Sequence, residues 1–90
     1  MGDVIMEFKD KSEALFQLWK CFDEDGRMSF SITSDFEGVS KLGGGCYWCA
    51  EFYSRSKAVG AMAKIIENAE NNGDVVDKSW LIEKYGRGTC

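Results

Sequence analysis

The sequence predicts a small α+β domain, with an antiparallel β-sheet of three or four strands and two helices packed on one face of the sheet. Strict alternation of apolar and polar residues from Arg27 to Thr33 predicts one strand. Two longer segments repeat apolar residues at helical spacing. The chain has 90 residues, 44% of them hydrophobic, so we expect residues 1–90 to form one domain around one core.

The first expected element is a strand over Asp3 to Phe8, because Val4, Met6 and Phe8 would share one face of it. The segment that follows is predicted to be a helix. Asp10, with Glu13 three residues later, matches a capping box at the start of a helix. The apolar residues that follow recur at intervals of three and four, as on one face of a helix: Leu15, Leu18, Trp19 and Phe22.

After the alternating strand, a polar loop with several glycines from Asp35 to Gly45 is expected to lead into a strand over about Cys46 to Tyr53. Ser54 or Ser56 is expected to cap a second helix, which ends at residues 71–73. The residues expected on its inward face are Val59, Met62, Ala63, Ile66 and Ala69.

The last segment fits two interpretations. Asp77 can cap a short helix, with Val76 and Leu81 forming a hydrophobic staple across its first turn. Alternatively, Ser79 to Tyr85 is a fourth strand. The strand is favoured, because it completes the order β-α-β-β-α-β, which gives an antiparallel sheet with both helices on one side.

Composition excludes several classes of function. With no histidine in the chain, a Ser-His or Cys-His catalytic pair cannot form within it. The formal net charge of −4 argues against a surface that grips phosphates. No apolar run approaches the ~20 residues of a membrane span, and no signal-peptide pattern is present, so we expect a cytoplasmic protein with reduced thiols and no contact with membranes.

Several residues follow the pattern of the RNA recognition motif: Asp35 after the alternating strand, Ala50-Glu51-Phe52 in the next strand, and Gly73 before the last segment. The chain resembles that family over nearly its whole length. The resemblance implies the ferredoxin-like order of elements and binding of single-stranded RNA. An RNA-binding module of this kind would use Tyr47, at one of the family's stacking positions, together with Tyr85 and Arg27.

The chain departs from this family at the positions that stack on bases. Cys49 stands where the second aromatic residue of the third strand is expected, and Ile5 where the first strand supplies another. Trp48 occupies a position that is usually small. Binding of RNA is therefore kept as the alternative function.

The segment from Gly44 to Glu51 resembles the active-site segment of A-class peptide methionine sulfoxide reductases. The resemblance implies Cys46 as nucleophile, Tyr47 with Trp48 around the substrate methyl group, Glu51 at the sulfoxide oxygen and Cys90 as resolving thiol. The match is short. A reactive thiol of this kind would also need Cys46 at the start of a helix, whereas a strand is expected there, so a thiol enzyme is the third interpretation.

A metal site built from Cys21, Cys46, Cys49 and Cys90 is not expected, and neither is a cofactor. The chain has a single CxxC pair, which without a second pair at matching spacing is a weak metal signal. On a strand, Cys46 and Cys49 would point to opposite faces and could not share a tetrahedral ion.

The sheet face away from the helices is expected to be aromatic and acidic. Its predicted members are Ile5, Glu7, Ser29, Ser31, Tyr47, Cys49, Glu51, Leu81, Glu83 and Tyr85. Carboxylates would repel the backbone of RNA, whereas such a face suits a protein partner. The sequence therefore predicts a non-enzymatic protein-binding or regulatory module, of the size of inhibitors encoded by phages and mobile elements. The expected partner-binding residues are Tyr47, Glu51, Tyr53, Tyr85, Asp23, Glu24, Asp25 and Lys41.

Overall fold

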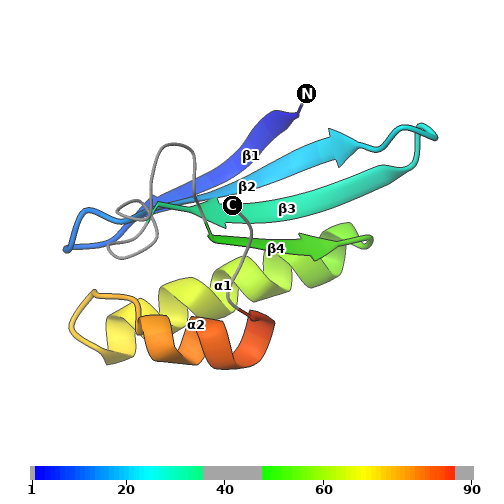
Figure 1. Cartoon of the computed structure of the whole chain (residues 1–90). Coiled ribbons are helices and arrows are strands. Elements are labelled where there is room, and N and C mark those ends of the chain that lie inside the picture. Colours follow the sequence, from blue (N-terminus) through cyan, green and yellow to red (C-terminus); the bar gives the residue numbers. More distant parts are fainter. Residues whose placement is uncertain (1, 36–47, 87–90) are drawn as a thin grey trace.

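A computed structural model of the chain describes residues 2–35 and 48–86 (Figure 1). Its elements are, in chain order, β1 (Asp3–Lys9), β2 (Leu15–Phe22), β3 (Met28–Ser34), β4 (Trp48–Phe52), α1 (Arg55–Asn71) and α2 (Lys78–Tyr85). The strands form one sheet in the order β1-β2-β3-β4, and each strand is antiparallel to its neighbour. Both helices lie on the same side of this sheet (Figure 1). The predicted α+β class, with an antiparallel sheet and two helices on one face, is confirmed.

The order of the elements differs from the prediction, because Leu15–Phe22 is a strand and not part of a helix. Apolar residues occupy both odd and even positions of this segment, so they satisfy helical spacing by coincidence. Phe16 and Leu18 are fully buried in the core, whereas Trp19 pairs with Ser31 on the other face of the sheet. The observed order is β-β-β-β-α-α, which is not the order that the resemblance to the RNA recognition motif implies.

Asp10 and Glu13 form a tight turn between β1 and β2 rather than a helix cap. The Asp10 carboxylate accepts hydrogen bonds from the backbone N–H groups of Ser12 at 2.9 Å and Ala14 at 3.0 Å. Glu13 adopts a φ of 70°, in the left-handed region. The capping-box interpretation was wrong because the short side chain of aspartate can satisfy the N–H groups of a turn as well as those of a helix.

The last segment is a helix, so the favoured strand over Ser79 to Tyr85 was wrong and the alternative is observed. The Asp77 carboxylate accepts from the backbone N–H groups of Ser79 and Trp80, at 2.9 and 3.4 Å. Val76 and Leu81, at 2% and 0% exposure, are buried on either side of this cap, as a hydrophobic staple requires.

The core lies between the sheet and the helices. Phe30 and Ile32 of β3 and Trp48 and Ala50 of β4 are buried in it. Ser54 caps α1, and the helix closes at Asn72, close to the predicted end. Its buried face is rotated from the predicted one and consists of Ala58, Ala61, Met62, Ile65 and Ala69. Of the helices in the described ranges, none is long and apolar enough to cross a membrane.

Candidate functional site

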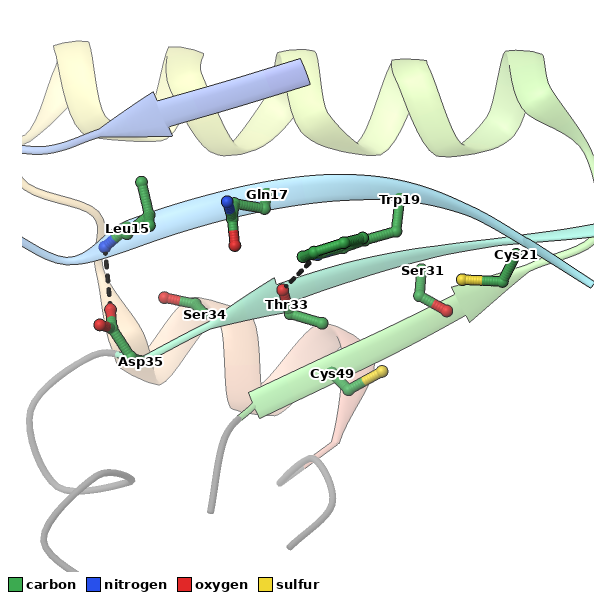
Figure 2. Close-up of a pocket in the computed structure, with 9 residues that line it drawn as sticks. All are labelled: Leu15, Gln17, Trp19, Cys21, Ser31, Thr33, Ser34, Asp35 and Cys49. Atoms are coloured by element: carbon green, nitrogen blue, oxygen red, sulfur yellow. Dashed lines mark hydrogen bonds between the residues drawn. The ribbon is translucent and has the colours of Figure 1, made fainter. Parts of the chain in front are cut away.

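A groove with a volume of about 430 Å³ lies on the open face of the sheet, which is the face opposite the helices. Figure 2 shows that its lining side chains come from β2, β3 and β4 and from the residue that follows β3. They are Leu15, Gln17, Trp19, Cys21, Ser31, Thr33, Ser34, Asp35 and Cys49. The volume falls within the range of about 300–1,000 Å³ that is typical of ligand sites.

Alternation along the strands places these side chains. In the β2–β3 ladder, Gln17 lies opposite Thr33 and Trp19 lies opposite Ser31. In the β3–β4 ladder, Cys49 lies opposite Thr33. The neighbour of Trp19 on β3, Ser31, is small, and the indole lies alongside β3 (Figure 2). Its neighbour on β1 is the exposed residue Val4.

The Trp19 side chain has a fixed orientation. Its Nε1–H donates a hydrogen bond of 2.9 Å to Thr33 Oγ1, on the neighbouring strand (Figure 2). The residue is half-buried, so part of the ring remains accessible from the groove. A large apolar ring held this way is a typical anchor in a binding surface, because little conformational freedom is lost when a partner contacts it.

Asp35 bounds the groove at the end of β3. Its carboxylate accepts a hydrogen bond of 3.0 Å from the backbone N–H of Leu15, and so ties the end of β3 to the start of β2 (Figure 2). Next to it, the Ser34 hydroxyl is buried and has no hydrogen-bond partner within residues 2–35 and 48–86. The register places Ser34 opposite the buried residues Phe16 and Trp48.

Two more carboxylates stand on the same face. Glu7 lies opposite Gln17 in the β1–β2 ladder and accepts a hydrogen bond of 3.3 Å from its side-chain amide. Glu51 lies opposite Ser31 in the β3–β4 ladder. Both glutamates are exposed. The groove is therefore bordered by acidic groups on β1, on β4 and after β3.

Tyr53, at 55% exposure, lies beside Glu51 and carries the Arg27 guanidinium over its ring, 4.2 Å from the centroid. A hydrogen bond to the Glu51 carboxylate and the negative charge of that group raise the pKa of Tyr53 above 10.0, and Arg27 opposes this rise. The predicted residues Glu51 and Tyr53 therefore lie together, on the side of the molecule that carries the groove.

The acidic residues 23–25 form the turn between β2 and β3, not the end of a helix. The Asp23 carboxylate accepts from the backbone N–H groups of Asp25 at 3.0 Å and Arg27 at 2.7 Å. Gly26 takes a φ of 80°, which a turn of this kind requires. Glu24 and Asp25 are exposed, so a partner could contact both.

Tyr85 is not on the open face, and this prediction was wrong. It belongs to α2, and its ring meets those of Trp48, Phe52 and Trp80 edge to face, with centroids 5.8, 6.0 and 6.0 Å apart. Burial raises the pKa of its hydroxyl. The same error in the last segment misplaced two further members of the face, because Leu81 is buried in the core and Glu83 lies on α2.

The remaining predicted positions divide into two groups. Ile5 packs partly against the core, next to an irregularity in the ladder between Val4 and Met6. Tyr47 and Lys41 lie outside the described residues, and so do Cys46 and Cys90 of the thiol interpretations. The part of the implied reductase segment that is described, from Trp48 onward, is a strand and not a helix.

Sequence reasoning missed the groove residues of β2, above all Trp19. Their signal was present in the alternation of Leu15, Gln17, Trp19 and Cys21, which appears once the segment is taken as a strand. Cys21 and Cys49 both line the groove. Within residues 2–35 and 48–86, no three side chains of Cys, Asp or Glu come together in a way that could hold a metal ion.

Comparisons of the chain with models of protein families, with curated proteins and with solved structures found no match. The geometry of the open face is therefore the basis for a functional assignment.

Proposed function

We propose that the chain is a non-enzymatic protein-binding module whose partner docks on the open face of the sheet. The observation that carries this proposal is the groove around Trp19, on the sheet face that neither helix covers. An exposed concave surface with an oriented aromatic residue is typical of interaction sites.

The charges of this face favour a protein over a nucleic acid. The formal net charge of the chain is −4, and Glu7, Asp35 and Glu51 border the groove. Phosphates bind mainly through Lys and Arg, so a partner with a phosphate backbone would meet repulsion here. Single-stranded RNA stacked on Trp19 is the competing occupant, and the experiment below distinguishes the two.

The hairpin between β2 and β3 offers further contact area. Phe22 and Met28 face each other across the ladder and are 52% and 43% exposed. Strand alternation puts both side chains on the face of the sheet that carries the helices, and the hairpin extends past the start of α1 (Figure 1). A partner on the open face would contact them only by wrapping around the end of this hairpin. A stable interface needs about 800 Å² on each side, which is more than the groove alone supplies.

Affinity capture from a lysate of the organism that encodes the chain tests the proposal, with nuclease added to one half of each sample. The test variant is Ser31→Arg, which places a long side chain in the groove beside Trp19. The matched control is Ala63→Arg, at an exposed position of α1 on the helix side. We expect at least one protein to be recovered by the wild type and the control, with or without nuclease, and lost with Ser31→Arg.

Two outcomes would contradict the proposal. If Ser31→Arg recovers the same proteins as the wild type, the open face is not the binding surface. If all recovery disappears with nuclease, the partner is RNA and the acidic border of the groove does not exclude it. Circular dichroism of both variants shows whether each remains folded.

A further inference from the structure

Resting on the proposed function, we infer that the groove receives a cationic side chain of the partner, with arginine preferred over lysine. The side chain stacks on the Trp19 indole and is held by the acidic border of the groove. The expected partner segment at this site is therefore a basic one.

The indole of Trp19 is the first element of this site. Tryptophan is the best aromatic partner for a cation placed over its face. The bond from Nε1 to Thr33 Oγ1 already uses the ring's polar atom, so what the ring offers to the groove is its π surface and its apolar edge. The same chain uses this interaction at its surface, where the Arg27 guanidinium lies 4.2 Å from the Tyr53 ring centroid.

The charges around the groove are the second element. Strand alternation places Glu7, Asp35 and Glu51 on the open face, and all three are exposed. Among the described residues, the cations that share this side are Lys9, opposite Leu15 at the β1 edge, and Arg27, which lies over Tyr53. The border of the groove is therefore left with an excess of negative charge, which attracts a positive group and repels an acidic one.

The polar atoms of the lining are the third element, and they favour a donor-rich group. Gln17, Ser31 and Asp35 each present an oxygen that can accept a hydrogen bond within the groove's lining. A guanidinium carries five N–H donors in a plane that also stacks on aromatic rings. Lysine offers three donors and no planar surface, so it fits this lining less well.

A second copy of the chain is a weaker occupant. Two copies that met through this face would bring their acidic borders together, at a net charge of −4 for each copy. Like charges placed opposite one another across an interface are costly. A basic partner gains from the same charges, so charge complementarity selects it.

Selection of peptides from a random dodecapeptide library displayed on phage tests the inference, with the full chain immobilised. A peptide enriched on the wild type is then synthesised, together with an analogue in which citrulline replaces arginine. Citrulline keeps the shape of the side chain and removes its charge. We expect enriched peptides to contain arginine and to lose affinity with citrulline by about threefold to thirtyfold, the range of a single cation–π contact.

Two variants locate the effect. Trp19→Leu keeps an apolar side chain in the groove and removes the π surface, so the arginine peptide should bind about threefold to thirtyfold more weakly. Glu7→Lys with Glu51→Lys reverses the border charge and should also weaken binding. Glu70→Lys with Glu83→Lys changes the net charge equally at exposed positions on the helices and should leave binding nearly unchanged.

The outcomes separate this inference from the proposed function. Dependence on the groove is tested with Ser31→Arg. If the peptides that depend on it contain no cationic residue, the inference is overturned and the proposal of protein binding is left intact. Equal affinity of the arginine and citrulline peptides would do the same. Self-association of the chain that Ser31→Arg abolishes would also overturn the inference alone. Absence of any peptide that depends on the groove would overturn both.

Discussion

At the scale of single residues, Asp10 joins two parts of the chain that are far apart in sequence. One carboxylate oxygen accepts from Ser12 and Ala14 in the β1–β2 turn, and the other accepts from the backbone N–H of Val76 at 3.1 Å. The side chain is buried. Ala14 and Val76 are buried, so without Asp10 their N–H groups would be left without a partner inside the molecule, which is costly.

We expect Asp10→Asn to lower the free energy of unfolding by about 1–3 kcal/mol. The amide can keep the bonds to the turn, but its –NH₂ group would face the Val76 N–H, which is also a donor. Chemical denaturation of the two proteins measures the difference. Asp74→Asn is the control, because the Asp74 carboxylate is exposed and pairs with the exposed Lys11 amine, at 3.2 Å. Equal losses in the two variants would contradict this role of Asp10.

The same carboxylate predicts a dependence on pH. Burial by itself would raise the pKa of Asp10, but the hydrogen bonds from Ser12, Val76 and Ala14 outweigh it and hold the pKa below 3.8. The contribution to stability is therefore complete above the unfolded-state pKa and is lost as the pH falls through the lower folded-state pKa. The stability difference between the wild type and Asp10→Asn should accordingly narrow below about pH 4. A stability difference between the two proteins that stays constant from pH 7 to pH 3 would show that the ionised Asp10 carboxylate is not its source.

At the scale of elements, strands and helices were predicted correctly where the apolar residues follow only one spacing, either that of a strand or that of a helix. The alternation in β3 and the capped apolar pattern of α1 are each compatible with one kind of element, and both were found. Leu15–Phe22 carries apolar residues on both faces, one buried against the helices and one at the groove, so its period could not be read locally. The groove on the open face could be predicted only if this segment was taken as a strand, and that is why the groove residues were missed.

The prediction for the last segment was wrong for a different reason. Its eight residues are short enough to fit either element, and the choice of a strand depended on an assumed order of the whole sheet. The local signals at Asp77, Val76 and Leu81 described the helix correctly. The expected order of the sheet was given more weight than the helix cap at Asp77, and the cap indicated the correct element.

We expect Asp77→Ala to lower the free energy of unfolding by about 0.5–2 kcal/mol, because it removes the cap of α2. Ser79→Ala, in the first turn and exposed, is the matched control and should be nearly neutral, since only the backbone N–H of Ser79 contacts the cap. Hydrogen exchange should also show faster exchange of the α2 amides in Asp77→Ala. A loss no larger than that of Ser79→Ala would argue against the cap.

At the scale of the whole molecule, the core and the proposed binding surface lie on opposite faces of the sheet. The helices and one face of the sheet enclose the core, and the large side chains buried there include Trp48, Phe16 and Ile32. The opposite face carries the groove, the oriented Trp19 and the acidic border. Substitutions on the open face should therefore alter binding with little effect on stability, whereas core substitutions should do the reverse.

The central claim is that the open face of the sheet is the binding surface, and its most direct test is a set of ¹⁵N–¹H correlation spectra recorded while a peptide selected on the wild-type chain is added. We predict that the backbone amides of Gln17, Trp19, Ser31 and Thr33 and the Trp19 indole N–H will shift, while the amides of α1 do not. Shifts confined to α1 and α2, with the Trp19 indole signal unchanged, would contradict the claim.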